Sequence, residues 1–171
     1  MSVILRISQA KPNPAGKDDA TVVMPQPEQL LGEWIDVENI GTESITFSLI
    51  QLHHTLFNDL CQTRGQTELY WSAEGTGLFK PGQVLRIHTG RQRDKSHLAA
   101  VDEEGADWHA YAERDGFVLN NRCGDIVVVS WQDEEGRSYK DAASYAPNPP
   151  ADAILKRIDN KLIIEDEEIT S

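Results

Sequence analysis

One basic cluster stands out in an otherwise acidic sequence. Residues 86–97 (RIHTGRQRDKSH) place four cations and two histidines against a single acid. Side chains of these types bind phosphate groups or acidic partners through charge-assisted hydrogen bonds. A solvated loop whose charges pair with neighbouring carboxylates is the alternative interpretation. The cluster is the best candidate for a contact surface, and we expect the partner to contact Arg86, His88, Arg91, Arg93 and Lys95.

Two acidic loops, residues 102–107 and 133–136, could in principle attract a cation. Calcium requires six or more oxygen ligands, and neither loop has the ligand spacing of an EF-hand. The loops are therefore interpreted as solvated turns. A weak calcium site between adjacent loops is left open by this pattern.

The residue types used in catalysis are present, but they form no recognised motif. His53 and His54 are adjacent, so a strand would point them to opposite faces and they could not hold one metal ion together. No nucleophile elbow or comparable motif accompanies the serines, cysteines and histidines. The sequence therefore predicts no enzyme, no catalytic residue, no cofactor and no metal site.

The two cysteines, Cys61 and Cys123, are far apart and lack the C-x-x-C spacing of a zinc site. We expect two reduced, partly buried thiols. A disulfide between them would require an oxidising compartment.

Charge and hydropathy restrict the partners and the location of the chain. The net charge of −12, from 28 acids and 16 bases in 171 residues, argues against nucleic acid and anionic lipid as partners. The apolar stretch at residues 3–7 is short and contains Arg6, and no later segment reaches membrane-spanning length. These features predict a cytoplasmic protein without membrane insertion, which contacts basic or neutral protein surfaces.

The elements that must position these residues are strands. Residues 33–38 (EWIDVE) alternate with a period of two, which predicts that Ile35 and Val37 face the core and Asp36 and Glu38 face water. Trp34 shares the outward face, where we expect the loop of residues 11–31 to cover it.

Further strands are predicted along the chain up to residue 146. In residues 45–52 the apolar positions change parity, which predicts a bulge near residues 48–49. Residues 126–129 and a strand ending at residue 145 form a hairpin around an acidic turn that closes at Gly136. The remaining candidates are residues 3–7, 67–71, 84–87 after a turn at 80–82, and 109–113.

Four segments in order carry a family resemblance over roughly residues 3–146: ILRISQAKPNPAGKD, GEWIDVENIGTESITF, LFKPGQVLRIHTG, and the series FVLNN, CGD, VVV, G, Y, D and SY. In these segments the chain resembles the lamin tail domain, of the bacterial stand-alone type. The resemblance implies an all-β, immunoglobulin-like β-sandwich of about eight strands, and a non-catalytic module that binds or tethers. It also implies that Leu85, Ile87, Val127 and Val129 face the core. Residues 53–76 and 91–107 have no counterpart in the family pattern.

The predicted organisation is a β-sandwich over residues 1–146, a proline-rich linker at 147–150 and an acidic amphipathic tail at 151–171. Asp159 and Asn160 predict a small hairpin or a bent arm in the tail, and a helix is the alternative. The apolar residues of the tail must either cover the edge of their own sandwich or dock onto another protein. Because the linker is stiff, we favour docking by strand addition onto a protein partner or a second copy. Its contact residues would be Ile154, Ile158, Leu162 and Ile164.

The sequence therefore predicts an adaptor or structural component that binds another protein or itself. The alternative is a DNA- or envelope-associated tether that uses the basic cluster at residues 86–97.

Overall fold

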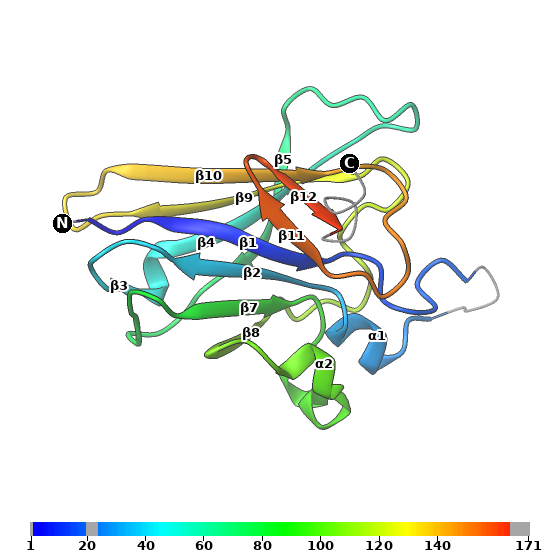
Figure 1. Cartoon of the computed structure of the whole chain (residues 1–171), viewed down its shortest axis with the longest axis horizontal. Helices are drawn as coiled ribbons and strands as arrows, with labels where there is room; N and C mark the ends of the chain where they lie inside the picture. Colours follow the sequence, from blue (N-terminus) through cyan, green and yellow to red (C-terminus); the bar gives the residue numbers. More distant parts are fainter. Residues whose placement is uncertain (1, 20–23, 165–171) are drawn as a thin grey trace.

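The computed structural model describes residues 2–19 and 24–164, and it shows a mainly β protein. Ten strands form one mixed sheet that is curled nearly into a barrel (Figure 1). The strands of the first half are β1 (Leu5–Lys11), β2 (Trp34–Asn39), β3 (Ile45–Thr46), β4 (Ile50–Thr55), β5 (Thr67–Ser72) and β6 (Leu78–Phe79). Those of the second half are β7 (Val84–His88), β8 (Trp108–Tyr111), β9 (Asp125–Gln132), β10 (Ser138–Tyr145), β11 (Leu155–Ile158) and β12 (Lys161–Ile164).

The strand order in the large sheet is β5-β4-β9-β10-β12-β11-β1-β2-β7-β8, and β3 pairs with β6 in a separate ribbon. All neighbours are antiparallel except the pairs β10 with β12 and β7 with β8. Two short helices, α1 (Pro27–Leu31) and α2 (Ala100–Glu103), and two 3-10 turns, η1 (Phe47–Leu49) and η2 (Gln92–His97), complete the described elements. The all-β prediction is confirmed at this level. The region predicted as a sandwich contains ten strands, β1–β10, instead of about eight. The 3-10 turn η1 divides one predicted strand into β3 and β4, and β6 was not predicted.

The apolar core lies inside the curled sheet. The six core residues predicted from sequence are all buried: Ile35, Val37, Leu85, Ile87, Val127 and Val129. Alternation predicted Ile35 and Val37 correctly because β2 turns one face toward this interior. The prediction of the other four came from the family resemblance.

The parity change in residues 45–52 has a clear structural cause. The chain passes through the 3-10 turn η1 between β3 and β4, and this turn rotates the side chains that follow it. Ile45 before the turn and Ile50 and Leu52 after it are therefore all buried. The predicted irregularity is at the right position, although it is a helical turn and not a β-bulge.

The prediction that Asp36, on the outward face of β2, faces water is wrong. Asp36 and Trp34 are both fully buried, and the described segments that cover them include α2. The indole Nε1 of Trp34 donates to Asp102 Oδ1 at 2.9 Å, and the guanidinium of Arg86 lies 3.8 Å from the centre of the Trp34 ring. The segment of residues 91–107 thus helps to cover Trp34, a role that the sequence analysis assigned to the loop of residues 11–31.

The tail forms a hairpin, as one of the sequence interpretations proposed. β11 and β12 pair with each other around Asp159, whose φ of 54° is in the left-handed region that asparagine and aspartate tolerate. The hairpin lies between β1 and β10 of the same chain, pairing antiparallel with β1 and parallel with β10 (Figure 1). The proline-rich linker thus turns the chain back, and the hairpin of the tail pairs with its own sheet. Residues 165–171 of the predicted tail lie outside the described residues, and docking of the tail onto a partner or a second copy stays a prediction.

A polar contact fastens this hairpin to both neighbouring strands. Arg157 pairs with Asp141 of β10 through two bonds of 2.8 and 3.0 Å, and it also donates to the carbonyl of Ile7 at 3.0 Å. Asp141 in turn accepts from the backbone N–H of Ile7 at 2.9 Å. The side chains of Asp141 and Arg157 thus satisfy the backbone N–H and C=O of Ile7, where no ladder of backbone hydrogen bonds joins β1 to β10.

The two ends of the sheet, β5 and β8, are connected by side chains. Arg114, which follows β8, donates to the carbonyls of Leu69 and Tyr70 on β5 at 2.6 and 3.2 Å. The hydroxyl of Tyr70 lies 2.5 Å from that of Thr89, which follows β7. These bonds hold the sheet ends together without completing a β-barrel ladder.

Cys61 and Cys123 form a disulfide, so the prediction of two free thiols is wrong. The bond ties the loop between β4 and β5 to the turn before β9, across a sequence separation of 62 residues. No helix among the described residues has the length and apolar character needed to cross a membrane.

Replacing Arg157 by Leu should lower the free energy of unfolding by about 3 kcal/mol, because Asp141 would keep a largely buried charge without its partner. The two side chains are only 8% and 21% exposed. Arg91→Leu is the matched control, since its pair with Asp115 is 28% and 76% exposed and should contribute less than about 1 kcal/mol. Urea unfolding measures both, and equal losses would contradict the role given to Arg157.

Reduction of the disulfide should lower the free energy of unfolding by about 2–4 kcal/mol, since the reduced unfolded chain regains conformational freedom. Denaturant titrations with and without a phosphine reductant measure the change. The Cys61→Ser/Cys123→Ser variant serves as the control, in which the reductant should have no effect. Alkylation of both cysteines in the denatured, unreduced protein would show that the bond is not formed.

Candidate functional site

The structure does not assemble the basic cluster that the sequence singled out. Arg86 is 2% exposed, and its Nε and Nη2 donate to Asp36 at 2.7 and 2.8 Å. Its Nη1 donates to the carbonyls of Asp102 and Glu104 at 3.2 and 2.6 Å. Arg86 is thus an internal cation that neutralises a buried carboxylate. The prediction that it contacts a partner is not supported by this position.

The remaining cluster residues divide between buried, paired and exposed positions. His88 is fully buried. Arg91 pairs with Asp115 at 2.7 Å, and that pairing raises the pKa of its guanidinium. Arg93 and Lys95 are exposed on η2, and their side chains have no charged partner among the described residues. Only these two cations present the surface that the cluster was expected to form.

His88 contacts two aromatic rings of β8. The centre of its ring lies 5.1 Å from that of His109 and 5.3 Å from that of Tyr111. Nδ1 of His88 is 2.7 Å from the carbonyl of Leu31, so it carries the proton, and Nε2 accepts from Nδ1 of His109 at 2.8 Å. Burial lowers the pKa of His88 to about 3, and burial also lowers the pKa of His109. Both imidazoles are therefore neutral at pH 7.

The described part of the chain does not form a metal site. Residues 2–19 and 24–164 contain no group of three or more histidine, cysteine or carboxylate side chains that could hold an ion.

The tail residues expected to contact a partner lie mostly against their own domain. Leu162 is buried, Ile154 and Ile164 are half-buried, and only Ile158 is exposed. A cavity of about 430 Å³ lies between β12 and residues 144–150, and Leu162 and Ile164 line it.

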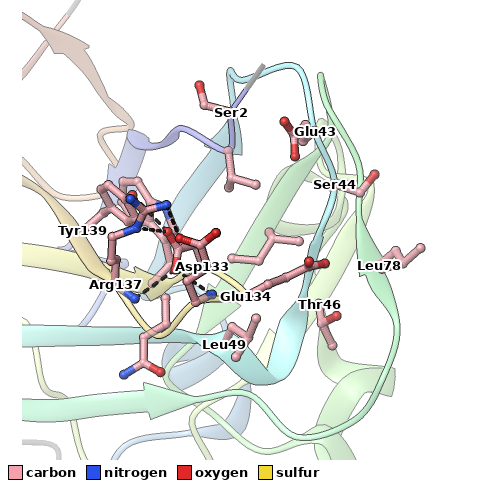
Figure 2. A pocket seen from close by; sticks show the side chains of 15 residues that line it. Ser2, Glu43, Ser44, Thr46, Leu49, Leu78, Asp133, Glu134, Arg137 and Tyr139 are labelled. Atoms are coloured by element: carbon pink, nitrogen blue, oxygen red, sulfur yellow. Dashed lines mark hydrogen bonds and ion pairs between the residues drawn. The ribbon is translucent and has the colours of Figure 1, made fainter.

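A larger pocket, of about 490 Å³, opens at the end of the curled sheet near β3 and the β9–β10 turn (Figures 1 and 2). We call it the barrel-end pocket. It is formed by the segment before β1, by β3 and η1, by β6, and by the turn that joins β9 to β10. Its lining residues include Ser2, Glu43, Ser44, Ile45, Thr46, Leu49, Leu78, Trp131, Asp133, Glu134, Glu135, Arg137 and Tyr139.

One wall of this pocket is a rigid hydrogen-bonded turn. Asp133 accepts from the backbone N–H of Glu135 and of Arg137, from the Arg137 guanidinium at 2.9 Å, and from the Tyr139 hydroxyl at 3.1 Å. Desolvation alone would raise the pKa of Asp133, but these hydrogen bonds hold the pKa below its usual range. Gly136 completes the turn with a φ of 79°, as the position of this glycine predicted.

Two carboxylates of the pocket have no partner within the described part of the chain. Glu43 and Glu134 are exposed, so water solvates them, and neither makes a hydrogen bond or ion pair with another described residue. Trp131 is only 6% exposed, and its Nε1 is a donor without an acceptor that is enclosed by protein and does not open into the pocket. Its ring stacks on Tyr139, with 5.9 Å between the centroids.

Sequence reasoning missed this site because it treated the acidic loop at residues 133–136 as a solvated turn. The available signal was the parity of β9. Trp131 shares the inward face with Val127 and Val129, so it lies at the inner end of a strand that leads directly into an acidic turn. The contribution of Glu43 had no local signal, because it comes from a segment about 90 residues away in the sequence.

Comparison with known proteins leaves the family of this chain open. No protein-family model matches it, and no curated protein matches it. The similarity to the lamin tail domain therefore stays a prediction that depends on the four sequence segments.

The free energy of unfolding should fall as the pH is lowered from 6.5 to 5. Unfolded His88 takes up a proton near pH 6.5, whereas folded His88 does so only near its lowered pKa of about 3. Each such histidine contributes a slope of up to about 1.4 kcal/mol per pH unit. The neighbouring charges of Arg86 and Lys11 favour the neutral ring.

His109 and His53, whose pKa values are also lowered, act in the same direction, while the raised pKa of Asp36 opposes it at lower pH. Urea unfolding between pH 5 and 7.5 measures the slope, and His88→Gln should make it shallower. An equally steep slope in His88→Gln would exclude His88 as its source.

Proposed function

We propose that this chain is a non-catalytic protein-binding module of the lamin-tail type, which acts as an adaptor or structural component and binds its partner at the barrel-end pocket. The observation that carries the proposal is the pocket itself, which has a volume of about 490 Å³. Its lining includes two exposed carboxylates, those of Glu43 and Glu134, which have no partner among the described residues. Loops on a rigid sheet supply the walls, an arrangement that commonly carries binding sites.

The sheet topology supports an immunoglobulin-like sandwich as the underlying architecture. The strands divide into β5-β4-β9-β10 on one side and β1-β2-β7-β8 on the other, and the hairpin β11–β12 joins the two sets. Without this bridge the chain would consist of two packed four-stranded layers, which is the arrangement of a β-sandwich. The tail hairpin is then an addition that converts a sandwich into a nearly closed sheet.

The tether that would use the basic cluster receives less support. Arg86 and His88 are internal, and Arg91 is paired with Asp115. Two exposed cations, Arg93 and Lys95, would neutralise few phosphates, and non-specific affinity for DNA rises with the number of phosphates neutralised.

The disulfide bears on where the protein acts. Disulfides persist in oxidising compartments and are rare in the reducing cytosol. The Cys61–Cys123 bond therefore favours an oxidising compartment over the cytoplasm expected from sequence.

Blocking the barrel-end pocket should abolish partner capture. Ser44 is exposed and lines the pocket, so Ser44→Trp should fill the opening without disturbing the core. Quantitative mass spectrometry of proteins captured from a lysate of the source cells would compare this variant with the unmodified chain. A partner captured by the unmodified chain should be depleted at least about tenfold, equivalent to about 1.4 kcal/mol.

Ser96→Trp is the matched control, because Ser96 is equally exposed but lies on η2 within the basic cluster. This control should capture the same partner as the unmodified chain. Loss of the partner in Ser96→Trp and its retention in Ser44→Trp would instead support the tether. Failure of the unmodified chain to enrich any protein would contradict the proposed function.

A further inference from the structure

One edge of the tail hairpin is almost unpaired. β12 forms a ladder with β11 over its whole length, but its only bridge to β10 in the described part of the chain joins Ser144 to Lys161. Ile158 and Lys161 flank a two-residue turn, so they exchange both backbone hydrogen bonds, and bonded and non-bonded pairs alternate from there. The backbone N–H and C=O groups of Leu162 and Ile164 therefore point away from β11, toward the side of β10.

Contacts on the far side of β10 keep its end away from this edge. Tyr145 pairs with the first residue of β9, and its carbonyl oxygen packs where a Cβ on Gly124 would otherwise lie. The N–H of Asn148 then donates to the carbonyl of Asn121 at 2.6 Å. These contacts draw the chain toward β9, so it diverges from β12 beyond residue 144 (Figure 1).

The divergence opens the cavity of about 430 Å³ between β12 and residues 144–150, which we call the tail groove. Its volume is within the range that takes a small ligand or a short peptide segment. Leu155 and Leu162 are its buried part, and Ile163 and Ile164 are half-buried. The opposite wall contains three prolines, which have no N–H and cannot complete a ladder with β12. Within the described residues, the chain thus supplies no strand to this edge beyond the single bridge at Lys161.

Charge restricts the segment that can fill the tail groove. Among the described residues that line it, only Lys161 is charged. Lys161 is exposed, and it forms no ion pair with another described residue. An acidic side chain beside Lys161 would form a charge-assisted hydrogen bond, whereas a basic one would be repelled.

We propose that the tail groove binds an extended, mainly apolar segment of a partner protein, which carries an acidic residue and adds to the free edge of β12 as a strand. The main chain of the segment bonds to the carbonyl of Leu162 and the N–H of Ile164, and its acidic residue pairs with Lys161. Strand addition gains affinity from main-chain bonds and specificity from the pockets for alternate side chains. The groove shares no lining residue with the barrel-end pocket, so the inference goes beyond the proposed function.

Fluorescence anisotropy with a labelled peptide of alternating valine and threonine, with a glutamate at each end, tests the charge requirement. This peptide should bind the unmodified chain at least about tenfold more tightly than the same peptide with a lysine at each end. Lys161→Glu should reverse the preference, because the attractive pair becomes a repulsive one. Lys80→Glu makes the same charge change at an exposed position between β6 and β7, and it should leave the preference unchanged.

Ile164→Pro tests the main-chain bonds. Proline removes the N–H of residue 164, which points away from β11, so the ladder of the hairpin stays intact. The variant should bind the glutamate-ended peptide about tenfold more weakly, with an unchanged Tm by circular dichroism. The same peptide with all its backbone nitrogens methylated should not bind, and this second measurement leaves the protein unaltered. Equal binding of the methylated and unmethylated peptides would overturn the inference.

Other occupants of the tail groove would give different results. If the peptide binds only after residues 165–171 are deleted, the end of the chain itself occupies the groove and the inference is wrong. If the unmodified chain sediments as a dimer and binds no peptide, β12 pairs with a second copy and the inference is likewise wrong.

The variant that fills the barrel-end pocket separates this inference from the proposed function. Ser44→Trp should leave binding of the glutamate-ended peptide unchanged, because Ser44 lines only the barrel-end pocket. Loss of the peptide in Ser44→Trp would place it at the barrel-end pocket, which would overturn the inference and support the proposed function.

Discussion

The structure depends on the burial of β2 on both of its faces. One face carries Ile35 and Val37 into the apolar core, and the other carries Trp34 and Asp36, which are also fully buried. A buried carboxylate without a partner would cost several kcal/mol, so β2 requires a cation and a cover at the same time. Arg86 of the neighbouring strand supplies the cation, and the segment 91–107 folds over it so that Asp102 can accept from Trp34 and from Lys11. The charged insertion that resembled a loose loop is thus part of the fold.

The two ends of the curled sheet differ in the exposure of their charged groups. At the end near α1 and α2, buried charges meet partners within the chain; Glu33, for example, accepts from Lys17, Thr89 and the backbone of residues 118 and 119. At the opposite end, the carboxylates of Glu43 and Glu134 are exposed at the barrel-end pocket and have no partner among the described residues. Water solvates these two carboxylates in the free protein, so they stay available to a partner.

The sequence predicted the features that depend on local pattern. Alternation placed Ile35 and Val37 in the core, and the turn ending at Gly136 identified the β9–β10 hairpin. Features set by distant neighbours could not be predicted this way. Alternation assumes that one face of a strand meets water, so it placed Asp36 in solvent, and composition cannot show that Cys61 meets Cys123 or that the tail hairpin returns to β1. The barrel-end pocket was missed for the same reason, since Glu43 and Glu134 meet only in the folded chain.

The central claim is that the buried Asp36 of β2 requires the guanidinium of Arg86, and urea unfolding of Arg86→Met tests this most directly. The account predicts a loss of about 3–5 kcal/mol in the free energy of unfolding, because Asp36 would keep a buried charge without a partner. Asp36→Asn/Arg86→Met, which removes both charges, should lose less. A loss in Arg86→Met that is no larger than in the double variant would contradict the account.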